Sequence, residues 1–224
     1  MRPMALFTAA LLATSPGAAR AADRFEKTAI FLEQTVQDAD AEVKFDIIGT
    51  SAAGLSALQV VAPDGRVVVD FKSPASKLGL HHLTLESPEP KNDGRLRADF
   101  PEGIYEFTGT TTSGDTLRGK ATLTHAFPAA ATIVRPRADE EKVPVTGLRV
   151  TWNPVKDAAA IAIVIEDEKS GGDVRATLPG NATGFAVPAG FLTGGTAYKL
   201  AVGTIAKSGN KTVSEISFTT AGKK

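Results

Sequence analysis

The feature that most constrains this chain is an alternation of apolar and polar residues that runs from about residue 29 almost to residue 220. Successive side chains of a β-strand point to opposite faces, so this alternation is typical of strands with one buried face. Turn-forming residues interrupt it at even intervals, and no long amphipathic helical pattern lies between them. The sequence therefore predicts an all-β protein built of sandwiches or barrels.

In the first half, the predicted strands are separated by recognisable turns. Pro63-Asp64-Gly65 is predicted to be a turn, because proline has a fixed φ, the aspartate side chain can cap the turn and glycine tolerates a positive φ. Asn92-Asp93-Gly94 is predicted to be a second turn, and Ser113-Gly114-Asp115 to close a threonine-rich hairpin. Segment 24–34 could form a helix, but its β-branched residues favour a strand. The strands expected here are 29–34, 41–49, 55–61, 67–69, 81–86, 104–111 and 116–125.

The segment 126–130, Ala-Phe-Pro-Ala-Ala, interrupts the alternation and predicts a boundary between two domains, 24–128 and 130–221. Because this connection is short, we expect the two domains to be held semi-rigidly. After a strand through Val134, the strands expected in the second half are 143–152, 161–166, 174–178, 184–187, 198–206 and 211–220.

Residues 1–21 have the pattern of an export signal. Arg2 supplies a positive start, and residues 4–13 form an apolar run too short to span a bilayer. Ala19-Arg20-Ala21 places small residues where a signal peptidase requires them, so cleavage is expected after residue 21 or one residue later. We therefore expect a periplasmic or extracellular protein with no transmembrane segment in the mature chain. The alanine-rich leader is of a bacterial style.

Composition excludes several classes of function. The chain has no cysteine, which excludes disulfides, thiolate catalysis and thiolate zinc sites. Its 25 basic and 25 acidic residues balance, so a nucleic-acid partner is not expected. No Gly-x-Ser-x-Gly motif or phosphate-binding glycine loop occurs. We expect no catalytic residues, no cofactor and no enzymatic activity.

Ordered motifs in residues 130–221 resemble those of a fibronectin type III domain. Residues 150–155 form a Val-x-Trp-x-Pro-Val run, residues 192–198 read Leu-Thr-Gly-Gly-Thr-Ala-Tyr, and Phe218-Thr219-Thr220 closes the domain. In that family these are the second strand, the tyrosine corner and the last strand. Two positions depart from the family pattern: Gly194 replaces the corner proline, and Ile161 replaces a tyrosine.

This resemblance implies an architectural role for the few large aromatic residues. Trp152 is expected in the sandwich core, and the Tyr198 hydroxyl is expected to bond backbone a few residues upstream. Tyr105 is expected to occupy a similar corner in the first half. No Trp or Tyr is then left for an aromatic platform that could bind polysaccharide or single-stranded nucleic acid. The loop 208–210 lies where such domains can present Arg-Gly-Asp, a tripeptide absent from this chain.

The first half resembles the second more loosely. Residues 100–105, Phe-Pro-Glu-Gly-Ile-Tyr, precede a strand, a Ser-Gly turn and a further strand, as residues 192–198 do. We therefore expect two tandem immunoglobulin-like or fibronectin type III-like β-sandwiches after a signal peptide. The whole resembles bacterial secreted proteins known only for containing fibronectin type III domains. That resemblance implies a fold and exposure, and no activity.

Two groups of residues suggest metal sites, although neither matches a metal-binding signature. His82 and Glu86 share one face of a strand, and His125 ends another, so the three are a conceivable zinc site. We favour solvated histidines instead. Asp38, Asp40 and Glu42 are conceivable calcium ligands but are expected to be surface charges that protect a strand edge. The run Asp139-Glu140-Glu141 is a second conceivable calcium site and is expected to be a charged surface loop.

The leading functional hypothesis is an exported, non-enzymatic binding or scaffold protein. Its partner is expected to be another protein or a cell-envelope component, bound through loops or strand edges. The edges expected to be most available are 116–124 and 212–219. One alternative is a periplasmic pilus-type chaperone that donates a strand carrying Leu117, Ala121 and Leu123. Another is a small metal-dependent hydrolase that uses the histidines.

Overall fold

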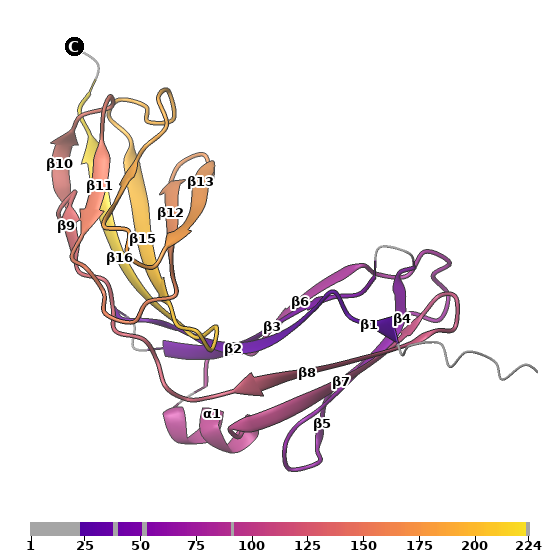
Figure 1. The fold of residues 1–224 in the computed structure, drawn as a ribbon. Helices are drawn as coiled ribbons and strands as arrows, with labels where there is room; N and C mark the ends of the chain where they lie inside the picture. Colours follow the sequence, from indigo (N-terminus) through magenta and orange to yellow (C-terminus); the bar gives the residue numbers. More distant parts are fainter. Residues whose placement is uncertain (1–22, 38–39, 51–52, 91, 223–224) are drawn as a thin grey trace, which may run out of the picture.

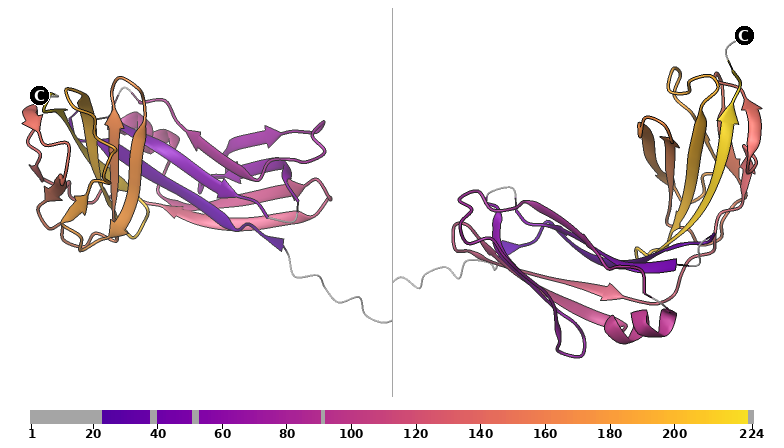
Figure 2. Two further views of the ribbon diagram at one scale, coloured as in Figure 1. Left: turned by 90° about the horizontal axis from the view of Figure 1, so that it is seen from above. Right: turned by 180° about the vertical axis from the view of Figure 1, so that it is seen from behind.

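A computed structural model describes residues 23–37, 40–50, 53–90 and 92–222. The predicted signal peptide lies outside these residues. The described chain is almost entirely β-structure, which confirms the all-β prediction, and it forms two sandwiches that meet at a bend (Figure 1). The view from behind shows the same bend (Figure 2). We call the concave side of this bend the elbow.

The first sandwich packs a five-stranded sheet, in the order β1-β8-β7-β4-β5, against the strands β2, β3 and β6. Its core contains the inward-facing residues of both layers, such as Ile30, Val43, Leu58 and Phe107. Its elements are β1 (Asp23–Arg24), β2 (Lys27–Thr35), β3 (Asp40–Ile48), β4 (Leu55–Val61), β5 (Val67–Lys72), β6 (His82–Glu86), α1 (Asp93–Asp99), β7 (Gly103–Thr111) and β8 (Thr116–Leu123).

The second sandwich packs a three-stranded sheet, in the order β14-β11-β9, against four strands in the order β13-β12-β15-β16. Its separate core includes Val150, Trp152, Ile163 and Leu200. Its elements are β9 (Ile133–Arg135), β10 (Glu140–Val143), β11 (Arg149–Trp152), β12 (Ala160–Asp167), β13 (Asp173–Pro179), β14 (Gly184–Ala186), β15 (Ala197–Ile205) and β16 (Lys211–Thr220).

The large aromatic residues are buried where the resemblance implied. Trp152 is 3 % exposed, and its Nε1 donates to the carbonyl of Ala182 at 2.8 Å. The buried Tyr198 hydroxyl accepts a hydrogen bond from the amide of Thr193 at 2.8 Å. In the first sandwich, the Tyr105 hydroxyl donates to the carbonyl of Pro101 at 3.0 Å, and burial raises the pKa of Tyr105 to about 12. Both tyrosine corners are therefore confirmed.

Two local predictions are wrong. Asn92-Asp93-Gly94 is not a simple turn but the start of α1, because the Asn92 side chain accepts from the amide of Arg95 at 3.0 Å and Leu96 is buried in the core. Asparagine suits both a turn and a helix N-cap, so local chemistry did not separate the two. The single strand predicted over 143–152 is two strands, β10 and β11, with Pro144 and the positive-φ Gly147 between them.

Candidate interaction surface at the elbow

The two sandwiches share a sheet. Strand β16 pairs in parallel with β2, and this places Lys211 opposite Glu33 and Val213 opposite Thr35. The four strands of the second sandwich thereby continue into β2, β3 and β6, and β10 adds to the other end of β16, to give one eight-stranded sheet. Main-chain pairing across the junction restrains the bend more than a covalent linker would.

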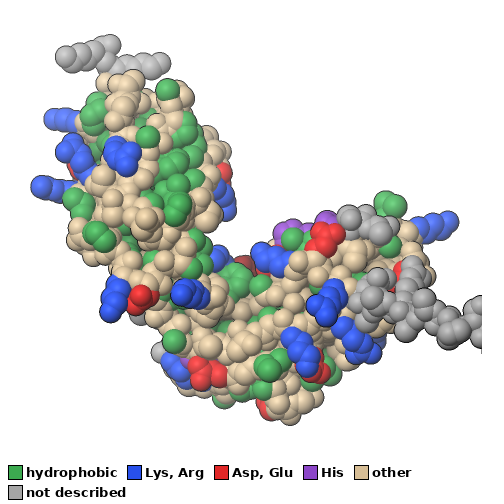
Figure 3. Space-filling view, in the orientation of Figure 1, with side chains coloured by type: hydrophobic (Ala, Val, Ile, Leu, Met, Phe, Trp, Pro, Cys, Tyr) green, Lys and Arg blue, Asp and Glu red, His purple; other side chains and the backbone are tan. Residues whose placement is uncertain are grey.

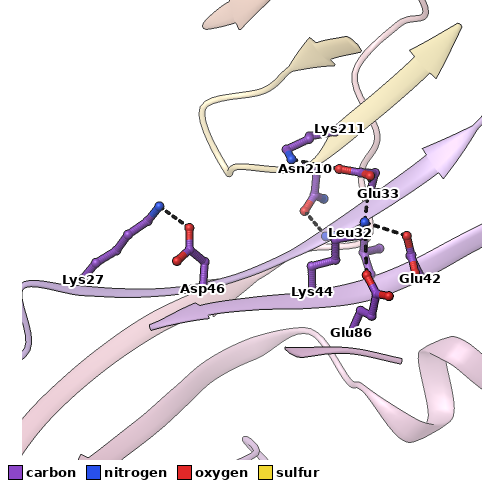
Figure 4. A network of polar contacts seen from close by, with 9 residues as sticks. All are labelled: Lys27, Leu32, Glu33, Glu42, Lys44, Asp46, Glu86, Asn210 and Lys211. Carbon is purple, nitrogen blue, oxygen red and sulfur yellow. Dashed lines mark hydrogen bonds and ion pairs between the residues drawn. The ribbon is translucent and has the colours of Figure 1, made fainter. Parts of the chain in front are cut away.

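Asn210 joins both sandwiches at this point. It lies just before β16, is 1 % exposed, and its Oδ1 accepts from the amide of Leu32 in β2 at 2.9 Å. Its Nδ2 donates to the carbonyls of Thr124 at 2.8 Å and Ala126 at 2.9 Å (Figure 4 shows the contact with Leu32). The loop 208–210 is therefore part of the joint, where this asparagine satisfies three main-chain groups.

Neighbouring side chains complete the joint. The Thr212 hydroxyl donates to the carbonyl of Pro128 at 2.7 Å, and the Gln34 amide donates to Thr212 at 3.0 Å. The Gln37 carboxamide takes the place of a strand beside Glu215: it donates to the Glu215 carbonyl at 2.9 Å and accepts from its amide at 3.1 Å.

The prediction that 212–219 is a free edge is therefore wrong, because β2, Gln37 and β10 cover that side of β16. On the side of β8 away from β7, the short strand β1 pairs only with Leu117 and Arg118.

The elbow carries a network of ion pairs on the outer face of the shared sheet (Figure 4). The Glu33 carboxylate lies 2.9 Å from Lys44 Nζ and 2.8 Å from Lys211 Nζ. Lys44 also contacts Glu42 at 2.8 Å and Glu86 at 3.5 Å. Burial alone would raise the pKa of Glu33, but its bonds to Lys211 and Lys44 outweigh that effect and hold the pKa below its usual value. Burial acts to lower the pKa of Lys44. Its bonds to the partner carboxylates outweigh that effect and hold the pKa above its usual value.

A second pair of contacts lies further along the same face. The Asp46 carboxylate bonds Lys27 at 2.5 Å and His82 Nε2 at 2.7 Å. Burial acts to raise the pKa of Asp46, yet these partners lower it overall. Lys211 Nζ also lies 4.7 Å from the centre of the Phe31 ring, in the range of a cation–π contact. The floor of the elbow is thus a set of paired charges around one aromatic ring.

A groove of about 440 Å³ lies in the elbow, between the outer faces of β12, β15 and β16 and those of β2, β3 and β6. On the second sandwich the wall combines small side chains with charged ones, and hydrophobic side chains gather on that side in the space-filling view (Figure 3). The residues that line this elbow groove are Phe31, Glu33, Lys44, Asp46, Thr84, Ala162, Val164, Glu166, Arg175, Lys199, Ala201, Gly203, Lys211, Val213 and Glu215.

The conceivable zinc ligands are not brought together. His82 and Glu86 share a face of β6, but their partners are Asp46 and Lys44. His125 follows β8, in the other layer of the first sandwich, and its Nε2 lies 2.8 Å from the carbonyl of Phe100. Within the described ranges, no group of three or more histidine, aspartate or glutamate side chains could hold a metal ion.

Among the described residues, the acidic side chains singled out from the sequence do not form a group that could hold a metal ion. Asp38 lies outside the described residues, and Glu42 is bonded to Lys44. Glu140 accepts from the amide of Arg137 at 2.8 Å. Two of the residues named for strand donation in the chaperone hypothesis, Leu117 and Leu123, are buried in the first core.

Sequence reasoning missed the residues that build the elbow. Glu33, Lys44, Lys211 and Asn210 stand in ordinary strand and turn contexts, and each is an unremarkable residue there. One signal was available: Glu33 and Lys44 carry opposite charges and lie on the same polar face of two neighbouring strands. Nothing local indicated that a turn 178 residues away would bond to Leu32.

Acidification is expected to weaken the joint. Because the pKa of Glu33 lies below its usual 4.5 in the folded protein, its ion pairs contribute stability that is complete above the unfolded pKa and is lost as the pH falls through the folded value. We expect the free energy of unfolding to be level down to about pH 5 and to fall below it. Measured by urea unfolding across this range, the fall in the free energy of unfolding should be shallower for Glu33→Gln than for the wild type. The exposed control Glu141→Gln should show the same fall as the wild type. Parallel curves for wild type and Glu33→Gln would contradict this assignment.

No helix in the described ranges is long and apolar enough to cross a membrane. No protein-family model matches the chain. No curated protein matches it in sequence.

Solved structures with similar strands include fibronectin(III)-like modules of Clostridium thermocellum CbhA, at 7 % identity over 88 % of this chain and 93 % of that chain, with a TM-score of 0.37. The chicken CNTN1 FN1–FN3 domains match at 12 % identity over 89 % and 64 %, with a TM-score of 0.34. A two-domain fibronectin type III segment of chicken tenascin matches at 11 % identity over 87 % and 94 %, with a TM-score of 0.30.

The strand arrangement and buried aromatic residues, rather than these scores, carry the fold assignment. A three-stranded layer packs on a four-stranded one, Trp152 fills the core, and Tyr198 closes a corner onto the backbone. The chain therefore consists of an immunoglobulin-like sandwich followed by a sandwich of fibronectin type III-like fold.

Proposed function

We propose that this protein is an exported, non-enzymatic scaffold that binds another protein or a cell-envelope component in the elbow groove. The observation that carries the proposal is the restrained joint: β16 pairs with β2, and the buried Asn210 bonds to both sandwiches. A concave surface held in one shape loses little conformational entropy when a partner binds. The groove also presents small apolar side chains beside charged ones.

Export is supported by the leader, in which a positive start, an apolar run and an Ala-x-Ala site follow in order. Expressed as the full chain in a bacterium, the protein should be recovered from the periplasm or medium with residues 1–21 removed. Mass spectrometry of the recovered protein measures the new N-terminus. A full-length chain retained in the cytoplasm would sink the export part of the proposal.

Binding in the elbow groove is tested in the same cells with a photo-crosslinking amino acid. Ala201 on the groove wall is the test position, and Ile104, which is 53 % exposed on the first sandwich, is the matched control. We expect Ala201 to give a defined adduct that is absent from Ile104. The same adduct should weaken when Val164, which also lines the groove, is replaced by arginine. Equal adducts from both positions would contradict binding in the elbow.

A further inference from the structure

Strand β13 is an open end of the eight-stranded sheet. It pairs with β12 on one side and has no strand neighbour on the other within the described part of the chain. Seven consecutive residues, from Asp173 opposite Glu166 to Pro179 opposite Ala160, keep one register without a bulge. This is a straight and regular edge, the kind that can accept an additional strand.

The hydrogen-bond pattern identifies which groups of β13 are free. The amide of Asp167 donates to the carbonyl of Gly172 at 2.8 Å, so this pair is a hydrogen-bonded pair of the antiparallel ladder. Such pairs alternate along a ladder. Val174, Ala176 and Leu178 therefore bond to β12, whereas the N–H and C=O groups of alternate residues point outward. The outward residues are Asp173, Arg175 and Thr177.

The neighbouring ladder supports the same pattern. The amide of Glu168 donates to the carbonyl of Ala197 at 3.2 Å. The even-numbered residues of β12 therefore form their main-chain hydrogen bonds with β15, and the odd-numbered residues form theirs with β13. The edge thus offers three donors and three acceptors in a row.

Few of the usual edge protections are present on β13. Its only proline is the last residue, and its two charged side chains neutralise each other, since Arg175 lies 2.6 Å from Asp173. Val174 and Ala176 on the inner side are only partly buried. By contrast, β6 at the other end of the sheet has only five residues and is followed by Pro88 and Pro90.

We propose that β13 binds an extended segment of a partner polypeptide as an added antiparallel strand, with an acidic side chain opposite Arg175 and a basic one opposite Asp173. Charge complementarity across the edge sets this pattern. Apolar side chains opposite Val174 and Ala176 would cover these two residues. Because Arg175 also lines the elbow groove, the added strand would extend the groove wall. The inference rests on the proposed function and specifies the chemistry of the partner.

The first test uses purified mature protein and a labelled peptide, Thr-Val-Glu-Val-Lys, flanked by solubilising residues, with fluorescence anisotropy as the readout. In antiparallel register its glutamate faces Arg175 and its lysine faces Asp173. The charge-swapped peptide Thr-Val-Lys-Val-Glu is the comparison. We expect the first peptide to bind about three- to tenfold more tightly, from two cross-strand ion pairs.

Two variants locate the binding. Thr177→Pro removes an outward N–H group without removing a hydrogen bond to β12. It should therefore weaken the binding of the peptide at least about tenfold and leave the midpoint of unfolding unchanged. The double variant Asp173→Lys with Arg175→Glu keeps a pair within the strand and should reverse the preference between the two peptides. If Thr177→Pro does not fold, this reversal still decides the matter.

The outcomes separate the edge from the elbow. Absence of peptide binding, or a preference that the double variant does not reverse, overturns the β13 proposal even if Ala201 crosslinks a partner in cells. A dimer that Thr177→Pro abolishes, detected by sedimentation, also overturns it, because a second copy would then occupy the edge. A charge-dependent peptide preference without an Ala201 adduct would retain β13 and reject the elbow groove as the binding surface.

Discussion

Replacing Asn210 with alanine is expected to lower the free energy of unfolding by about 2–4 kcal/mol, since buried polar groups left without partners cost about 1–3 kcal/mol each. The substitution leaves the amide of Leu32 and the carbonyls of Thr124 and Ala126 without this side chain in a buried joint. Asn210→Asp should be at least as damaging, because it retains the acceptor for Leu32 and places a carboxylate against two carbonyls. Asn181→Ala, at an exposed turn, is the matched control.

Two spectroscopic readouts make this prediction specific to the joint. Trp152 is the single tryptophan of the chain and lies in the second sandwich, so its fluorescence follows that domain, whereas far-ultraviolet circular dichroism follows both. In urea, the two transitions should coincide for the wild type, because one sheet runs through both sandwiches. They should separate for Asn210→Ala. A change no larger than that of Asn181→Ala would show that the joint does not depend on this side chain.

Replacing Trp152 with alanine is expected to cost about 3–5 kcal/mol, the usual range for removing a large buried aromatic side chain. The indole ring packs in the second core, and its Nε1 bonds the carbonyl of Ala182 at 2.8 Å. Trp152→Phe is the matched control, because it keeps most of the apolar volume and loses the hydrogen bond. Its cost should therefore be clearly smaller. Circular dichroism in urea measures both variants, and equal costs would contradict the packing argument.

Local sequence patterns were sufficient for most of the strands and for both tyrosine corners. Alternation of apolar residues reports directly on which side of a strand is buried, and this holds whatever the strand's neighbours are. The helix α1 was missed because Asn92 suits a turn as well as an N-cap, and only the burial of Leu96 separates the two. Element type was thus predictable where one local interaction dominated.

Strand edges were predicted poorly for a different reason. The last strand of a sandwich is usually an edge, yet here β16 is covered by β2, which comes from the start of the described chain. The side chain of Gln37 then occupies the remaining main-chain groups at Glu215. Whether a strand is open depends on partners that its own residues do not specify.

By itself, the amino-acid sequence determined the all-β class, the two sandwiches and the architectural use of Trp152, Tyr105 and Tyr198, because those features follow from residues close together in the chain. Only the tertiary structure decided the elbow, the ion pairs around Glu33 and the edge of β13 that no described strand covers. These depend on pairing between distant segments, such as Asn210 and Leu32, which lie 178 residues apart. Many alternative pairings satisfy the same local alternation, and the packing of the whole chain selects among them.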